Sequence, residues 1–99
     1  MKIELNEIYV FKLTTGEETV AKVEEISDTH YTVKQPINAI ITPQGLQLMP
    51  GLFTANPDKL VLLNISCIAM VAIPREDISS SYIQATTGIA PISKKIITG

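Results

Sequence analysis

The sequence of 99 residues has few of the side chains that build reactive sites, with one cysteine, one histidine and no tryptophan. A lone cysteine cannot form a disulfide within its chain, and Cys67 lies in an apolar run, so we expect a buried thiol there. One histidine and one cysteine do not make a zinc site. We find no phosphate loop, dinucleotide fingerprint or nucleophile motif. The sequence therefore predicts no catalytic residue, no cofactor and no metal, and a protein that is not an enzyme.

Positive charge is also scarce, because Arg75 is the only arginine and the formal net charge is -2. A chain with this balance has no overall basic field to attract nucleic acid. Residues 1–28 carry seven acidic residues against three lysines. Neighbouring residues of a strand point to opposite faces, so Glu17–Glu18 and Glu24–Glu25 are read as solvated surface and not as catalytic carboxylate pairs.

Hydrophobic residues make up 45% of the chain and charged residues only 18%, which predicts that some apolar surface meets another chain. The longest apolar run, residues 60–74, is too short and too interrupted to cross a membrane, and no signal peptide is visible. We therefore expect a cytoplasmic protein without membrane contact.

Residues 9–35 predict three antiparallel strands joined by two turns. Apolar and polar residues alternate on either side of Gly16, which suits the positive φ of a short hairpin loop. Ser27–Asp28–Thr29 favours a second reversal, because Ser and Asp side chains bond their own backbone. Pro36 then predicts a bend, a bulge or an edge, since it cannot donate to a ladder.

The remaining chain predicts further strands followed by a helix. Residues 37–42 and 46–53 have strand character around a turn at 42–45, with a break at Pro50–Gly51. For residues 60–74, periodicity alone leaves a buried helix open, but length and branched residues favour two strands with a bend near 64–66. Residues 75–87 predict a helix with Ile78, Tyr82 and Ile83 on one side.

These elements divide the chain into three expected parts. Residues 1–74 form the β domain, residues 75–88 a helix that packs on it and ends at Gly88, and residues 89–99 a tail.

The residues Leu13, Gly16, Ala21, Val23, and Asp28 or Ser27 resemble the first motif of the Sm-like superfamily, which includes the Sm, LSm and Hfq proteins. That resemblance implies a small five-stranded SH3-like barrel, here with a C-terminal helix. Ala21 replaces a motif glycine, and the arginine and glycine of the second motif are absent near residues 63–65. Residues 42–45, 55–57 and 81–89 resemble small uncharacterised Sm-like proteins of T4-like marine cyanophages.

The resemblance implies a homo-oligomeric ring of about five to seven copies, because strand edges left on a small barrel recruit neighbours and head-to-tail contacts close into rings. It places RNA contacts at two turns, which here gives Thr29, His30, Tyr31 and Asn64 as RNA-binding candidates. His30 or Tyr31 would stack on a base. In the alternative interpretation, Tyr31 packs inside the barrel and His30 is an ordinary turn residue. Lys94 and Lys95 are either phosphate contacts or solvated charges.

Two functions follow from these expectations. The first is a non-enzymatic ring-forming Sm-like protein that binds single-stranded RNA at its pore. The alternative is a structural or protein-interaction ring of phage origin, in the host cytoplasm, that does not bind RNA.

Overall fold

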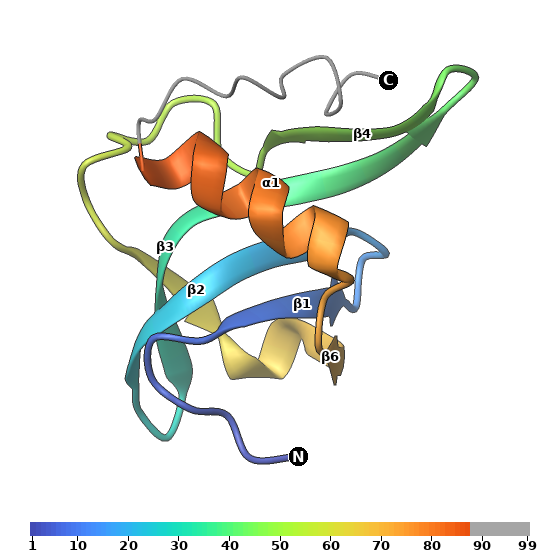
Figure 1. Ribbon diagram of the computed structural model, residues 1–99. Coiled ribbons are helices and arrows are strands. Elements are labelled where there is room, and N and C mark those ends of the chain that lie inside the picture. The colour runs from blue at the N-terminus through green and yellow to red at the C-terminus, as the bar shows by residue number, and fades with distance from the viewer. Residues whose placement is uncertain (88–99) are drawn as a thin grey trace.

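The computed structural model describes residues 1–87 and shows an antiparallel sheet of six strands with one helix at its C-terminal end (Figure 1). The elements, in chain order, are β1 (Ile8–Leu13), β2 (Glu18–Ile26), β3 (His30–Thr42), β4 (Gly45–Pro50), β5 (Val61–Asn64), the 3-10 helix η1 (Ile65–Cys67), β6 (Ile68–Ala72) and α1 (Glu76–Thr87). The mostly β class with a C-terminal helix is confirmed. Gly45–Pro50 is the strand expected within residues 46–53, and His30–Thr42 forms one continuous strand where two were expected.

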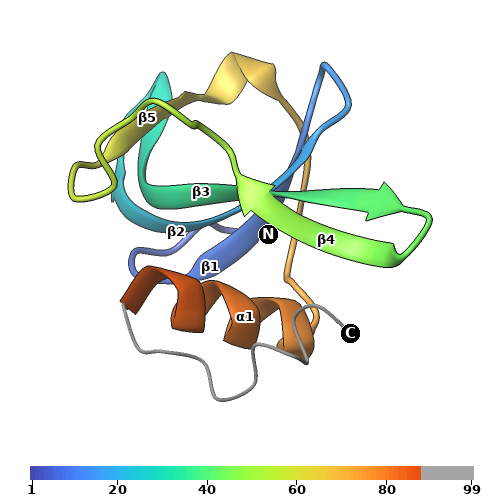
Figure 2. The ribbon, with the colours of Figure 1, turned by 90° about the horizontal axis from the view of Figure 1, so that it is seen from above.

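The long strand β3 is shared between two partners along one side. Its first part, His30 to Val33, pairs with β5, and its second part, Ile37 to Thr42, pairs with β4. Along its other side β3 pairs with β2, which pairs with β1, and β1 pairs with β6. Figure 2 shows that these strands curve, and that the β3–β4 hairpin extends away from the rest of the chain.

The bend in β3 lies at Gln35 and Pro36, where the pairing with β2 is irregular. Lys22 is opposite Lys34 and Val20 is opposite Ile37, so two residues of β3 face Ala21 alone. Gln35 has a φ of 39°, in the left-handed region that bulges usually reserve for glycine. The interruption predicted from Pro36 is therefore confirmed as a bulge.

The concave face of the sheet holds the core. Tyr9, Phe11, Ala21, Val23 and Val33 form a buried cluster from the first three strands. The ring centroids of Tyr9 and Phe11 lie 6.1 Å apart, a usual distance for tilted aromatic pairs. Gly16, at φ 108°, makes the hairpin between β1 and β2 possible, as its position in the sequence predicted.

The convex face is covered by α1, which crosses β2 and β3 (Figures 1 and 2). Tyr82 is the buried side chain of this helix, and Val20 is the buried apolar residue of β2 that the core cluster does not include. The Tyr82 hydroxyl accepts from the backbone N–H of Lys22 (3.0 Å) and donates to the backbone carbonyl of Lys34. The prediction that Ile83 shares the buried side was wrong, since Ile83 is 46% exposed.

The apolar run before Pro74 forms two short strands and not a helix, as predicted. The bend between them is η1, at Ile65–Cys67. The backbone N–H of Thr14 donates to the Cys67 carbonyl (2.8 Å), so the backbone of this segment is fixed. The expected burial of the Cys67 thiol was wrong, because the turn of η1 directs that residue to the exposed surface.

The helix predicted over 75–87 is confirmed as Glu76–Thr87. Arg75 precedes it and pairs with Asp77 (Nη2 to Oδ2, 2.5 Å), which lowers the pKa of that carboxyl. The expected stop at Gly88 and the tail 89–99 lie outside the described residues. Within residues 1–87, no helix is long and apolar enough to cross a membrane.

Candidate functional site

Two turns that are far apart in the sequence lie together at one end of the sheet. His30, at the start of β3, is directly opposite Asn64, at the end of β5. The backbone N–H of Ile65 donates to the Thr29 carbonyl (3.0 Å), which joins η1 to the turn before β3. We call the side chains of Ser27, Thr29, His30, Asn64 and Ser66 the loop cluster. It contains three of the four RNA-binding candidates.

The imidazole of His30 is held by hydroxyl groups of its own turn. Its Nδ1 lies 3.2 Å from Ser27 Oγ and 3.0 Å from Thr29 Oγ1. Ser27 Oγ also accepts from the backbone N–H of His30 (3.2 Å), as expected of serine in a tight turn. The residue is half-buried, and the contacts at Nδ1 hold the ring against its own turn.

The side chain of Asn64 is engaged in capping η1. Its Oδ1 accepts from both the backbone N–H and the hydroxyl of Ser66, each at 3.0 Å. This bond satisfies a backbone donor at the start of a short helix. The carboxamide of Asn64 therefore has a structural partner and carries no charge.

Tyr31 does not join the loop cluster. Its ring lies 5.8 Å from that of Phe11, and its side chain packs half-buried against the core. Successive side chains of a strand point to opposite faces. Because Tyr31 directly follows His30, its side chain lies on the other face of β3. The structure thus places Tyr31 where the alternative interpretation put it.

The charge of this region comes from acids. Asp28 lies in the turn and Glu25 is exposed nearby at the end of β2, whereas the loop cluster contains no lysine or arginine. Lys94 and Lys95 lie outside the described residues. Among residues 1–87, no three His, Cys, Asp or Glu side chains are grouped so as to hold a metal ion.

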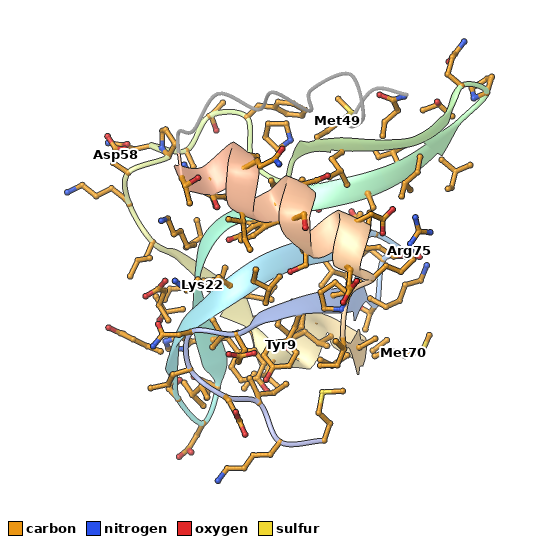
Figure 3. All side chains as sticks on the ribbon, viewed as in Figure 1. Tyr9, Lys22, Met49, Asp58, Met70 and Arg75 are labelled. Carbon is orange, nitrogen blue, oxygen red and sulfur yellow. The ribbon has the colours of Figure 1, made fainter. Side chains whose placement is uncertain are left out.

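The strands on either side of η1 form a second surface feature. In the part of the chain that the structure describes, β5 pairs only with β3 and β6 only with β1, so each leaves one backbone edge without a strand. Leu62 on β5 is 65% exposed and Met70 on β6 is 63% exposed. Figure 3 shows Met70 at the margin of the molecule.

Leu62 and Met70 were not singled out in the sequence, although some apolar surface was expected to meet another chain. Alternation within β5 is the signal that identifies Leu62, because its neighbours Val61 and Leu63 are half-buried against the core. A continuous apolar run does not show which alternate residues face the core. The pairing register of the strand is needed to assign them.

Comparison with known proteins provides no family for this chain: no protein-family model matches it, and no curated protein matches it. The functional interpretation therefore depends on the loop cluster and on the two strand edges.

Proposed function

We propose that this chain is a non-enzymatic, Sm-like subunit of a closed homo-oligomeric ring, in which β5 of one copy pairs with β6 of the next. The observation that carries the proposal is the pair of unpartnered edges that bear exposed Leu62 and Met70. Unpaired strand edges with large apolar side chains recruit further strands, and single chains that remain separate usually blunt them with charge or proline.

The positions of these edges favour a ring over a symmetric dimer. β5 borders the first part of β3 and β6 borders β1, on opposite sides of the strand order β3–β2–β1, while η1 joins β5 to β6 through three residues. An edge of one kind that meets an edge of the other kind makes a head-to-tail contact, which closes into a ring when the rotation allows. We propose about five to seven copies, as the Sm-like resemblance implies.

The arrangement of β5, η1 and β6 also supports our proposal that the chain forms a five-stranded SH3-like barrel. The segment from β5 through η1 to β6 connects the two ends of the strand order β3–β2–β1 around one buried cluster. In this interpretation β4 is an addition that extends the second part of β3 and lies outside the barrel.

A second candidate function is binding of single-stranded RNA at the pore of this ring. Its support is that Thr29, His30 and Asn64 gather at one place, with an imidazole available for stacking. The acidic neighbours and the neutral Asn64 weaken this candidate, since single-strand binding normally uses a cationic groove. The alternative, a protein-interaction ring of phage origin, requires no such groove.

Light scattering after size exclusion tests the ring. At micromolar concentration we expect a mass of about five to seven chains for the wild type, and of one chain for the double variant Leu62→Lys, Met70→Lys, because lysine on an edge opposes pairing. Ile41→Lys is the matched control, as Ile41 is 79% exposed on the projecting hairpin. A monomeric wild-type protein would contradict the proposal.

Fluorescence anisotropy with labelled oligo-U and oligo-A, at low and at physiological salt, tests the RNA candidate. We expect His30→Ala to weaken binding about tenfold by removing one stacking contact. Gln44→Ala, in the exposed turn between β3 and β4, is the control. If about 50 µM protein shows no saturable binding, the RNA-binding candidate is rejected. The protein-interaction ring is then the function that is kept.

A further inference from the structure

The outer edge of β4 is a strand edge that the proposed ring does not use. Within residues 1–87, β4 pairs with β3 on one side and with no strand on the other. It belongs to the β3–β4 hairpin, which Figure 2 shows extending away from the other elements. Backbone N–H and C=O groups along such an edge are free to pair with a further strand.

The register between β3 and β4 determines which backbone groups this edge offers. The N–H of Gly51 donates to the Pro36 carbonyl (2.8 Å), and this pair continues the register of β4 with β3 without a shift. Hydrogen-bonded and non-hydrogen-bonded pairs alternate along an antiparallel ladder, so every second residue of β4 counted back from Gly51 bonds β3. The intervening residues point their backbone groups away from β3, and they are Leu46, Leu48 and Pro50.

The N–H groups that this edge offers to a partner strand belong to Leu46 and Leu48. Pro50 has no N–H. Beyond the other end of the strand, the N–H of Gln44 already donates to Thr42 Oγ1 (3.2 Å). A second β4 laid antiparallel uses both leucines when Leu46 of each copy is opposite Leu48 of the other, because such a pair exchanges both of its N–H···O bonds. This register is two-fold symmetric, so the edge is complementary to itself.

The lack of charge in the hairpin favours a second copy as the partner. Residues 35–57 contain no charged side chain. Around a two-fold axis each side chain meets its own copy, so a charged residue at the centre would repel itself. Strand edges that stay unpaired usually carry charge, above all lysine. An uncharged edge is therefore suited to its own copy, and it offers nothing to a partner that is recognised by charge.

The side chains beside the axis are also compatible with their own copies. Ile41, which is 79% exposed, is opposite Leu46 on the hairpin, and directly opposite residues share one face of a sheet. In the paired register, Ile41 and Leu46 of one copy form one apolar row with Leu48 of the other. Gln47 faces Gln47 of the second copy, and a carboxamide both donates and accepts hydrogen bonds.

We propose that β4 pairs antiparallel with β4 of a second copy, with Leu46 opposite Leu48 and Gln47 at the two-fold axis. The contact does not depend on the proposed ring, because it uses neither β5 nor β6. Only one short strand from each copy takes part, so the interface is far smaller than the roughly 1,600 Å² of standard complexes. Single chains therefore pair at concentrations well above micromolar, as in a transient contact.

Sedimentation equilibrium of the full-length double variant Leu62→Lys, Met70→Lys isolates this contact, because lysine on the edges of β5 and β6 opposes pairing there. We expect the mass to rise from one chain at about 10 µM to nearly two chains at about 1 mM. Adding Gln47→Glu should hold the mass at one chain at pH 7, since two carboxylates would meet at the axis. Ser80→Glu is the matched control, because it adds the same charge at an exposed position of α1 and should leave the dimer unchanged.

A mixture of Gln47→Glu and Gln47→Lys, both in that double variant, tests the register. Each alone should remain a single chain at about 1 mM, and the equimolar mixture should reach the mass of two chains, because residue 47 meets its own counterpart in this pairing. Association of the mixture also shows that both variants are folded.

Three results decide the outcome. If the double variant stays a single chain at about 1 mM, the proposal is overturned and the edge is left to a strand of another protein. A dimer that persists with Gln47→Glu alone, or a mixture that does not associate, would overturn the proposed pairing. A wild type that is a single chain at micromolar concentration removes the ring alone and leaves these measurements unaffected.

Discussion

The two faces of the curved sheet are held in different ways. The concave face buries a cluster drawn from three successive strands, with Phe11 and Val23 completely inaccessible. Within residues 1–87 the convex face is covered by α1, and its buried apolar side chains are Val20 and Tyr82. Apolar packing among neighbours in the sequence therefore holds one face, while a single aromatic residue from the far end of the described chain anchors the other.

The hydroxyl of Tyr82 bonds the backbone beside the bulge between β2 and β3. Lys22 and Lys34 are opposite each other beside the bulge, and the phenol hydroxyl bonds one backbone group from each. Burial is the main reason that the pKa of Tyr82 rises to about 12. The helix is therefore attached through polar bonds that an apolar residue in its place would not make.

The largest effect is expected on the concave face. Phe11→Ala should reduce the free energy of unfolding by about 3–5 kcal/mol, because it removes a fully buried ring and leaves a cavity among close-packed neighbours. Urea denaturation measures the loss. Phe53→Ala is the control: Phe53 is 75% exposed, so its loss should be within about 0.5 kcal/mol. Similar losses in the two variants would show that this face does not hold the fold.

The pH dependence of unfolding tests the convex face. The pKa of Tyr82 rises from 10.0 to about 12 on folding, so its contribution to stability is complete below pH 10. Between pH 10 and pH 12 the unfolded chain ionises first. The free energy of unfolding should then fall by up to about 3 kcal/mol from this residue.

Tyr82→Phe isolates that contribution, because the variant lacks the ionising group. At pH 8 it should be less stable than the wild type by about 1–3 kcal/mol, since it leaves the Lys34 carbonyl and the Lys22 N–H unpaired. The difference should narrow as the pH rises to 12. Tyr31→Phe serves as the control, and a constant Tyr82→Phe difference across this range would contradict the role given to the hydroxyl.

The smallest effect comes from one substitution made on both faces of β2. Val23→Ala should cost about 2 kcal/mol and Val20→Ala about 1 kcal/mol, although both residues are buried. The surroundings of Val23 are closed by the core cluster, whereas a helix attached mainly through Tyr82 can settle onto a smaller residue at position 20. Thermal or urea unfolding distinguishes the two, and equal costs would mean that both faces are equally rigid.

Much of the fold was predictable because it is encoded locally. Alternation around Gly16 gave the first hairpin, Pro36 gave the irregularity in β3, and the residues between Asn64 and Ser66 gave the bend of η1. Each of these signals involves residues close together in the sequence. Burial of Val20 and exposure of Cys67 were missed because they depend on which element covers a face, and contacts between Tyr82 and β2 span sixty residues.

The candidate sites show the same limit. Thr29, His30 and Asn64 lie close together because β3 pairs with β5, while their role in RNA binding stays a prediction. The side chains were less predictable: Tyr31 packs on the core and Asn64 caps η1. The left-handed backbone of Gln35 was not predicted, because the bulge that contains it depends on the register between β2 and β3.

The sharing of β3 between two partners bears on how such a chain can evolve. Residues beyond Ile37 pair with β4 and reach no member of the buried cluster. Insertions or deletions at the hairpin tip therefore change the length of the projecting arm without altering the residues that stabilise the remainder. Related chains can thus differ in the reach of this arm while they keep the same central architecture.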